Sequence, residues 1–428
     1  MAAKKLSKVP EEVKMKKGDK PAAVEKNHSK VPEEVKTKKG DKPATAAKRL
    51  SGVPASGTVA LSNLVSQMKS MGIDIVSFSM GEPDFVTPEN IVEACKASLN
   101  EGFTHYTPSA GIPELRKAIA AKAFSDNRIP CTAKNVLVTP CKHAIFMSAL
   151  AFLDPGDEVI LPDPSWVSYE ACIRLAGAKP VYIPTKFDDN FIIDPSLISA
   201  SITPKTKMIV LNSPSNPTGS VIPCETIKDI SKIAIENNLT VLSDEIYESI
   251  IYEGKHHSVA AVPDMFERTI TISGLSKTYA MTGWRLGWAI ASEKSIKELD
   301  KLQTHSISCC VSFTQPAAVE AINGPQKEKE NMVKEFKKRR DLAVDLIRDI
   351  KGLDVNVPKG AFYLFPKYDS KVKSEVLCTK MLEEAHVAVT PGSAFGPCGE
   401  GFFRLSYAAS EDQIREGLSR IKKFMNNL

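Results

Sequence analysis

A single lysine stands between two short apolar runs in the segment TISGLSKTYAMTGWRLGWA, which covers residues 271–289. Small residues surround Lys277, and Arg285 follows it between two glycines. Such a segment lets the backbone approach a bulky ligand while an amine and a guanidinium reach toward it. Considered alone, Lys277 could equally be a loop lysine in water, so the neighbouring motifs must decide between the two interpretations.

Other polar residues suited to chemistry lie next to short apolar runs. Asp244 follows a run that predicts a strand, Tyr247 comes three residues later, and Asn216 lies in the sequence NSPSNPTG. In isolation, Asp244 would usually be a helix cap or a turn residue, and Asn-Pro-Thr-Gly would be a simple turn. Arg404, in GFFRLS, is different, because an arginine among apolar strand residues is unfavourable unless an anion pairs with it.

Together these segments resemble the class I aminotransferases, which use pyridoxal 5'-phosphate. The resemblance covers roughly residues 50–428 and holds at every constrained position from Gly274 to Gly287, apart from the departures described below. The spacings of 28 residues from Asn216 to Asp244 and 33 residues from Asp244 to Lys277 also fit this family. The resemblance implies a fold-type I enzyme similar to aspartate aminotransferase.

The resemblance implies a role for each of these polar residues. Lys277 would form a Schiff base with the cofactor and would then move the proton of the substrate Cα. Asp244 would pair with the protonated pyridine nitrogen of the cofactor. Asn216 and Tyr247 would donate to its phenolate oxygen and so lower the pKa of the Schiff base, and Arg285 would bind its phosphate.

Further positions follow from the same resemblance. Trp166 would stack on the pyridine ring, and Tyr106 would reach the cofactor phosphate of the neighbouring subunit, so that a homodimer with shared active sites is expected. Gly81 and Arg404 would bind the substrate α-carboxylate, with Asn216 beside them. Each of the two aromatic residues could instead be a packing residue.

The expected phosphate-binding loop departs from the family pattern. It reads VTPCKH at residues 138–143, and Pro140 has no backbone N–H to donate. Cys141 and Lys142 keep their N–H groups at the predicted start of a helix, where anions bind favourably. We therefore expect Cys141 and Lys142 to contribute to the cofactor site.

A second departure lies three residues before the Schiff-base lysine. Gly274 stands there in place of the family serine, and either Ser273 or Ser276 could replace it.

Lys142 also bears on the substrate. It matches the lysine that reads the distal substrate carboxylate in one branch of bacterial and archaeal aspartate aminotransferases, so aspartate or glutamate is predicted, with a 2-oxo acid as acceptor. Relatives that accept prephenate carry a basic residue where Pro54 stands, which weighs against prephenate. A broader or aromatic specificity, or a fold-type I lyase reaction, is the alternative.

The remaining pattern predicts an α/β protein with a large cofactor-binding domain and a smaller α+β domain. Short apolar segments alternate with helical patterns and predict a mainly parallel seven-stranded sheet between helices. The expected strands are residues 136–138, 158–161, 180–183, 208–211, 240–242, 269–272 and 286–291. The expected helices include residues 61–71, 112–124, 143–152, 167–176, 224–237 and 327–350.

The predicted domains use both ends of the chain. We expect the large domain at residues 95–323 and the small domain at residues 324–428, completed by residues 51–94. A strand at residues 73–79 and strands near residues 362–365 and 403–407 are expected in the small domain.

Residues 1–50 differ from the rest. They contain a tandem repeat, SKVPEEVK-x-KKGDKPA, at Ser7–Ala22 and Ser29–Ala44, and they hold 15 basic against 7 acidic residues. A segment so polar and so rich in proline is expected to be disordered. The remaining chain holds 41 basic and 44 acidic residues, which argues against nucleic-acid binding by the folded part. A transcription regulator on the same fold is disfavoured too, because the repeat is unsuited to a winged helix.

The nine cysteines are scattered, and their spacing suggests neither a metal site nor a disulfide framework. No apolar run is long enough to cross a bilayer, and the beginning lacks the apolar segment of a secretory signal. We therefore expect a cytoplasmic protein without membrane association.

Overall fold

The computed structural model describes residues 45–50, 52–53 and 57–428. Residues 1–46 and 47–428 form separate units, and the fold below is that of the second. Most of the repeat-containing tail and Pro54 lie outside the described residues, so the predictions made for them stay predictions.

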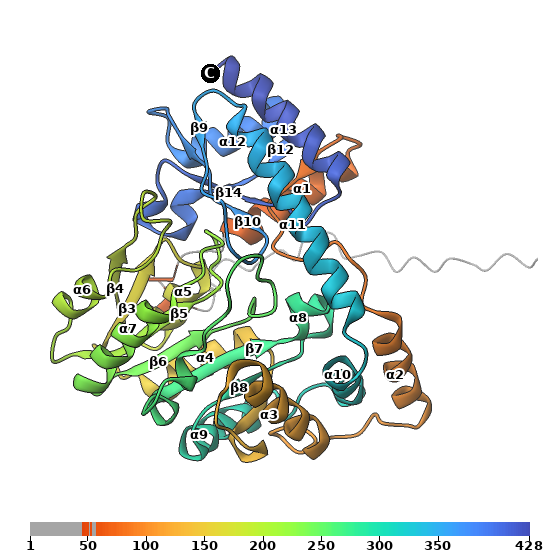
Figure 1. The fold of residues 1–428 in the computed structure, drawn as a ribbon, viewed down its shortest axis with the longest axis vertical. Helices are drawn as coiled ribbons and strands as arrows, with labels where there is room; N and C mark the ends of the chain where they lie inside the picture. Colours follow the sequence, from red (N-terminus) through yellow and green to blue (C-terminus); the bar gives the residue numbers. More distant parts are fainter. Residues whose placement is uncertain (1–44, 51, 54–56) are drawn as a thin grey trace, which may run out of the picture. The chain divides into compact units, whose positions relative to one another are not determined.

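A seven-stranded sheet in the order β2-β8-β7-β6-β5-β3-β4 forms the centre of the larger part (Figure 1). Only β8 runs against its neighbours, and the other strands are parallel. The strands are β2 (Val136–Val138), β3 (Glu158–Asp163), β4 (Lys179–Pro184), β5 (Thr206–Asn212), β6 (Thr240–Asp244), β7 (Thr269–Gly274) and β8 (Gly287–Ile290). The prediction of a mainly parallel seven-stranded sheet is confirmed, and all of its strands lie where expected.

Helices bury both faces of this sheet, which is why its strands are almost continuously apolar. Along β2, Leu137 joins one core cluster while Val136 and Val138 join another on the opposite face. The covering helices are α2 (Glu89–Asn100), α3 (Pro113–Asn127), α4 (Cys141–Phe152), α5 (Val167–Leu175), α6 (Pro195–Ala200), α7 (Cys224–Glu236), α9 (Glu293–Thr304) and α10 (Thr314–Asn323).

The smaller part combines segments from both ends of the described chain. β1 pairs in parallel with β12, and β10, β14 and β13 form an antiparallel sheet. Its strands are β1 (Val76–Ser77), β9 (Leu353–Asp354), β10 (Tyr363–Leu364), β11 (Lys367–Tyr368), β12 (Val387–Ala388), β13 (Thr390–Pro391) and β14 (Phe403–Ser406). Its helices are α1 (Gly57–Ser70), α11 (Lys327–Arg348), α12 (Ser374–Ala385) and α13 (Glu411–Asn426).

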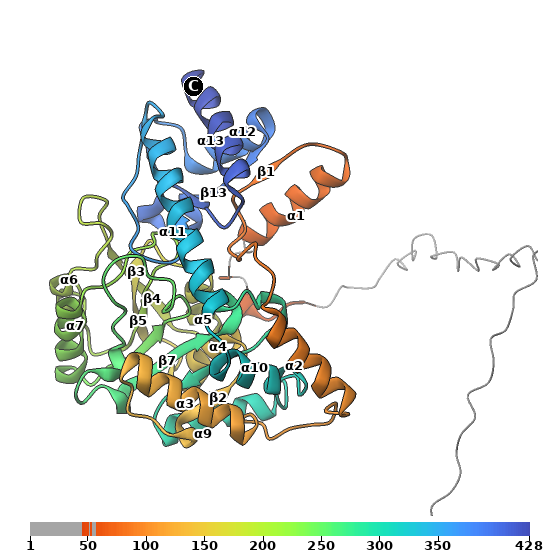
Figure 2. The same cartoon turned by 45° about the vertical axis from the view of Figure 1, so that its right-hand side comes forward.

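One strand differs in extent from the sequence expectation. The strand expected at residues 73–79 is confined to Val76–Ser77, because only these residues pair with β12. The long charged helix α11 forms as predicted; it begins near α10 and runs toward α13 in both views (Figures 1 and 2). The proposed domain boundaries stay a prediction. No helix of the described residues combines the length and apolarity needed to span a membrane.

The polar residues singled out in the sequence lie at one edge of the large sheet. Asp244 ends β6, and in register with it Asn212 ends β5. Gly274 ends β7 opposite Gly287, and the short helix α8 (Leu275–Thr278) carries Lys277 directly after it. Because parallel strands share the edge at which they end, these residues converge beyond it.

Candidate active site

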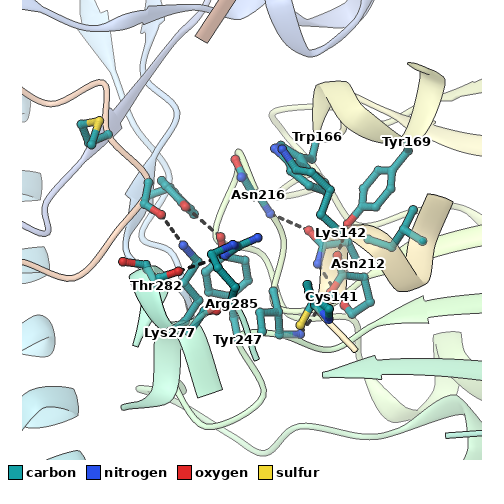
Figure 3. A pocket seen from close by; sticks show the side chains of 18 of the residues that line it. Cys141, Lys142, Trp166, Tyr169, Asn212, Asn216, Tyr247, Lys277, Thr282 and Arg285 are labelled. Atoms are coloured by element: carbon teal, nitrogen blue, oxygen red, sulfur yellow. Dashed lines mark hydrogen bonds between the residues drawn. The ribbon is translucent and has the colours of Figure 1, made fainter. Parts of the chain in front are cut away.

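A cavity of about 390 Å³ opens at this edge. Every residue predicted to bind the cofactor or substrate lines it, except Tyr106. In Figure 3, Lys277 and Thr282 enter from one side of the view, and Trp166 and Tyr169 from the other. The polar and aromatic lining residues include Gly81, Cys141, Lys142, Trp166, Tyr169, Asn212, Asn216, Asp244, Tyr247, Ser276, Lys277, Thr282, Arg285, Tyr363 and Arg404.

Lys277 faces this cavity with its amine. Its Nζ donates to the carbonyl oxygen of Gly81 at 2.5 Å. Burial lowers the pKa of Lys277 to about 8, because the ammonium loses its hydration, and the nearby carboxylate of Glu82 opposes this shift. A lysine with such a pKa offers a neutral, nucleophilic amine near neutral pH.

Asp244 is a buried acid at the base of the cavity, 4% exposed. Its Oδ2 accepts a hydrogen bond from the Tyr169 hydroxyl at 2.6 Å, and its Oδ1 accepts one from the backbone N–H of Ile246 at 3.2 Å. Burial raises the pKa of Asp244 to about 6, although the bond from Tyr169 opposes the rise. No ion pair within the described residues includes Asp244, so its carboxylate suits a cationic group of a ligand.

Arg404 presents the opposite charge, and its side chain is buried. Its Nη1 donates to Asn216 Oδ1 at 3.0 Å and its Nη2 to the Ser79 carbonyl oxygen at 2.6 Å, while its Nε has no hydrogen-bond partner in the described residues. The guanidinium lies over the rings of Tyr363 and Phe395. No carboxylate pairs with it among the described residues, so this buried cation favours an anionic ligand.

Tyr247 and Tyr363 form a hydroxyl pair on the wall of the cavity, with their oxygens 2.8 Å apart. Burial raises the pKa of both hydroxyls, so both keep their protons at neutral pH. The Tyr363 hydroxyl also lies against Gly81, where an added Cβ would come within 2.6 Å of it. The backbone at Gly81 can therefore approach a ligand only because this residue has no side chain.

Two further cations face the cavity. Lys142 lies over the ring of Trp166, 4.8 Å from its centroid. Burial and the neighbouring Arg285 lower the pKa of Lys142. Arg285 donates through Nη1 to the Thr282 carbonyl oxygen at 2.9 Å and has no ion-pair partner in the described chain. The cavity therefore carries more positive than negative groups, which favours anionic ligands.

Cys141 explains why residue 274 is a glycine. It is the first residue of α4, and its Sγ donates to the Ser273 carbonyl oxygen at 3.1 Å. A Cβ added at Gly274 would lie 2.7 Å from that sulfur and 2.7 Å from the Cα of Gly287. The sulfur therefore fills the space that a serine at position 274 would need.

The two serines considered as replacements point to different sides. The Ser273 hydroxyl donates to Glu248 Oε1 at 2.9 Å, away from the cavity. Ser276 lines the cavity, so of the two it is the one placed beside a ligand.

Tyr106 does not line the cavity of its own chain. Its side chain is 88% exposed, which leaves the expected contact with a second subunit as a prediction.

Sequence reasoning gave no role to Tyr169 or Tyr363. Tyr169 lies three residues after Trp166, which precedes the first residue of α5, and this closeness in the sequence could have indicated it. Tyr363 lies in the segment PKGAFY, which resembles the family, but its contact with Gly81 depends on the tertiary structure.

Residues 73–421 match the family described as aminotransferase class I and II, and the chain belongs to this family. It is thus an aminotransferase, as the sequence resemblance predicted.

Individual relatives show how far the similarity extends. The aspartate aminotransferase of Musicola paradisiaca (strain Ech703) is 42% identical over 371 residues, which cover 86% of this chain and 93% of the relative. The aromatic-amino-acid aminotransferase 2 of Thermococcus litoralis is 40% identical over 363 residues, covering 83% and 93%. The solved aspartate aminotransferase of Thermus thermophilus with maleate has a TM-score of 0.85 at 37% identity and covers 89% of this chain and 99% of that one.

Proposed function

We propose that the protein transfers the amino group of an acidic amino acid, aspartate or glutamate, to a 2-oxo acid, with pyridoxal 5'-phosphate as its cofactor. One observation supports this most directly. The same cavity brings together the amine of Lys277, the buried carboxylate of Asp244 and the buried guanidinium of Arg404, and within the described part of the chain neither Asp244 nor Arg404 has an ion-pair partner. These groups complement an aldehyde, a ring cation and a substrate carboxylate, respectively.

The residues present fit this cofactor. Lys277 would hold it covalently, Asp244 would pair with its pyridine nitrogen, and Trp166 would cover its ring. The Oδ1 of Asn216 accepts a hydrogen bond from Arg404, so the amide nitrogen of Asn216 is the atom that would donate to the phenolate oxygen. Tyr247 would be the second donor. When bound, the cofactor supplies an electron-withdrawing ring that stabilises negative charge at the substrate Cα.

The phosphate of the cofactor would lie near the start of α4. The backbone N–H groups of Cys141 and Lys142 are the first of that helix, and Pro140 before them provides none. Arg285 and Ser276 also line the cavity and would supply the side-chain donors.

The protein groups would divide the remaining work. Arg404 would orient the substrate through its α-carboxylate, and the Gly81 backbone would lie beside it. The amine of Lys277, once released from the cofactor, would take the proton from the substrate Cα and return it. Its lowered pKa supports this role, because a base must be partly unprotonated at the working pH.

Lys142 would select the acidic side chain of the substrate. Its ammonium is held over Trp166 by a cation–π contact and has no carboxylate partner in the described residues. The alternative is a broader, aromatic or prephenate specificity, since one relative is named an aromatic-amino-acid aminotransferase, or else a lyase reaction on the same scaffold.

Amino-donor profiles of the wild type and Lys142→Ala test this proposal. We expect kcat/KM for aspartate and glutamate to fall at least about tenfold in Lys142→Ala, while alanine and phenylalanine change little. Lys134→Ala, at an exposed lysine, is the matched control. Equal losses for all donors would refute the acidic specificity. A Lys277→Ala variant that keeps full turnover would refute the transaminase itself.

We also propose a homodimer in which Tyr106 completes the site of the partner, since its ring is exposed and does not line the active-site cavity of its own chain. Mixing inactive Lys277→Ala and Tyr106→Ala subunits should then restore about a quarter of the activity, because half of the dimers are mixed and each has one intact site. The expected cytoplasmic location stays a prediction.

A further inference from the structure

A second group of ionisable residues lies behind the active-site strands. Glu245 follows Asp244 directly and Glu248 comes four residues after it, but their side chains do not line the cavity. They are 1% and 8% exposed, respectively. Neither glutamate has a role in the proposed transamination. Two buried carboxylates this close to each other need cations or hydrogen-bond donors beside them.

Glu248, in the turn after β6, joins α3 and β7. Its Oε1 accepts hydrogen bonds from Lys122 Nζ of α3 at 2.7 Å and from the Ser273 hydroxyl of β7 at 2.9 Å, and its Oε2 accepts from Asn127. Ser273 lies four residues before Lys277. Glu248 therefore contacts β7 close to the start of α8, the helix that carries Lys277.

Glu245 holds the end of β6 in the same way. Its Oε1 accepts from the hydroxyls of Ser243 and Ser258, each at 2.8 Å. Its Oε2 lies 2.9 Å from Nε2 of His256, whose side chain is 5% exposed. The backbone N–H of Glu245 donates to the Ile272 carbonyl oxygen of β7 at 2.8 Å, which ties the two strands together.

Among Lys122, Glu245, Glu248 and His256, the charges balance when His256 is protonated, a state in which its buried Nδ1, without a hydrogen-bond partner in the described residues, also carries a proton. Lys122 and His256 then face Glu245 and Glu248, two cations against two anions, and Lys122 also reaches Asp126 at 3.3 Å near the surface. The charged groups that face His256 are Glu245, Glu248 and Lys122. The two glutamates raise its pKa against the effect of burial, and Lys122 opposes them.

We propose that Lys122, Glu245, Glu248 and His256 form a charge-balanced positioning cluster that holds the ends of β6 and β7, and through them Asp244 and Lys277, in their working arrangement. The inference rests on the proposed function of those two residues. The cluster atoms of Glu245, Glu248 and His256 lie within 4.8 Å of one another. However, the Lys122 ammonium already contacts Glu248, so the cluster suits a proton better than a metal ion.

Two variants that remove charges of opposite sign show whether the cluster acts through its charge or only through packing. His256→Gln keeps a donor toward Glu245 but removes the positive charge, and Glu248→Gln removes a negative charge at nearly constant size. In the holoenzyme, the visible absorbance band of the lysine-bound cofactor should titrate at higher pH in His256→Gln and at lower pH in Glu248→Gln. We expect shifts of about 0.5 pH unit or more, together with a larger fall in kcat than change in KM.

Arg340→Met provides the control for a destabilised protein. Arg340 is a buried cation that pairs with Glu253 and Asp341 in the smaller part. Its replacement should lower stability without moving the absorbance transition. Shifts in the same direction for both glutamine variants, or no shift in either, would overturn the proposal.

The pH dependence of the stability of the cofactor-free protein tests the cluster independently of the proposed function. Folding raises the pKa of His256, so protonated His256 stabilises the folded protein. This stabilisation is complete at a pH below the pKa of His256 in the unfolded chain, and it is lost as the pH rises through the pKa in the folded protein. The urea midpoint of the wild type should therefore fall more steeply with pH above about 6.5 than that of His256→Gln. Identical slopes would overturn the charge balance, whereas failure to bind cofactor would refute only the proposed function.

Discussion

The amine of Lys277 should react with aldehydes much faster than an ordinary lysine near neutral pH. A lysine in water has a pKa near 10.5, and burial lowers that of Lys277 to about 8. At pH 7 roughly one in ten molecules then carries the neutral amine, compared with roughly one in 3000 for an unperturbed lysine. The expected advantage in reactive amine is therefore roughly 300-fold.

The rate at which the cofactor-free protein captures pyridoxal measures this amine directly. Pyridoxal has no phosphate, so the titration of a phosphate does not complicate the pH profile. The second-order rate, followed by absorbance, should rise about tenfold per pH unit below pH 7 and level off near pH 8. Lys277→Met provides the background rate from other lysines.

The carboxylate of Glu82 allows a test of the direction in which the pKa of Lys277 shifts. This carboxylate raises the pKa of Lys277 and accepts a hydrogen bond from Thr282 at 2.8 Å, which a glutamine can also accept. Glu82→Gln should therefore move the plateau to lower pH, whereas Glu253→Gln, at a remote exposed carboxylate, should leave it in place. A capture rate that still rises through pH 10, or a plateau that moves up in Glu82→Gln, would refute the reasoning.

Three further predictions address single features of the site. Arg404→Lys should lower kcat/KM by about 100-fold or more, because the planar pair with the substrate carboxylate is lost, and an unchanged kcat/KM in steady-state kinetics would contradict this. Gly274→Ser should lower the free energy of unfolding by about 1–3 kcal/mol, because the serine Cβ would clash with the sulfur of Cys141. Adding Cys141→Gly to the same protein should recover part of this loss, and strictly additive effects of the two substitutions in urea unfolding would rule out the clash. Asp244→Asn should abolish most activity yet stabilise the cofactor-free protein at pH 7 by about 2–3 kcal/mol, because the folded state raises the pKa of this acid to about 6, and this gain should vanish near pH 4. A variant less stable than the wild type at pH 7 would contradict that sign.

The sequence by itself determined the large sheet and the residues around its edge. Its strands are short, apolar and separated by helical patterns, so their positions follow from local periodicity. Lys277, Asp244 and Asn216 could be selected because each follows such a strand at a spacing typical of one family. The two-residue strands of the smaller part could not be predicted in this way, because β1 exists only through its pairing with the distant β12.

Only the tertiary structure decided the contacts that give these residues their properties. Tyr363 meets Gly81 across the cavity, and the sulfur of Cys141 fills the space beside Gly274, although each pair is far apart in the sequence. The pKa shifts of Lys277 and Asp244 likewise depend on burial by segments from the whole chain. A sequence motif fixes which groups are present, but the loss of water around them, which sets their charge, arises only when distant segments pack together.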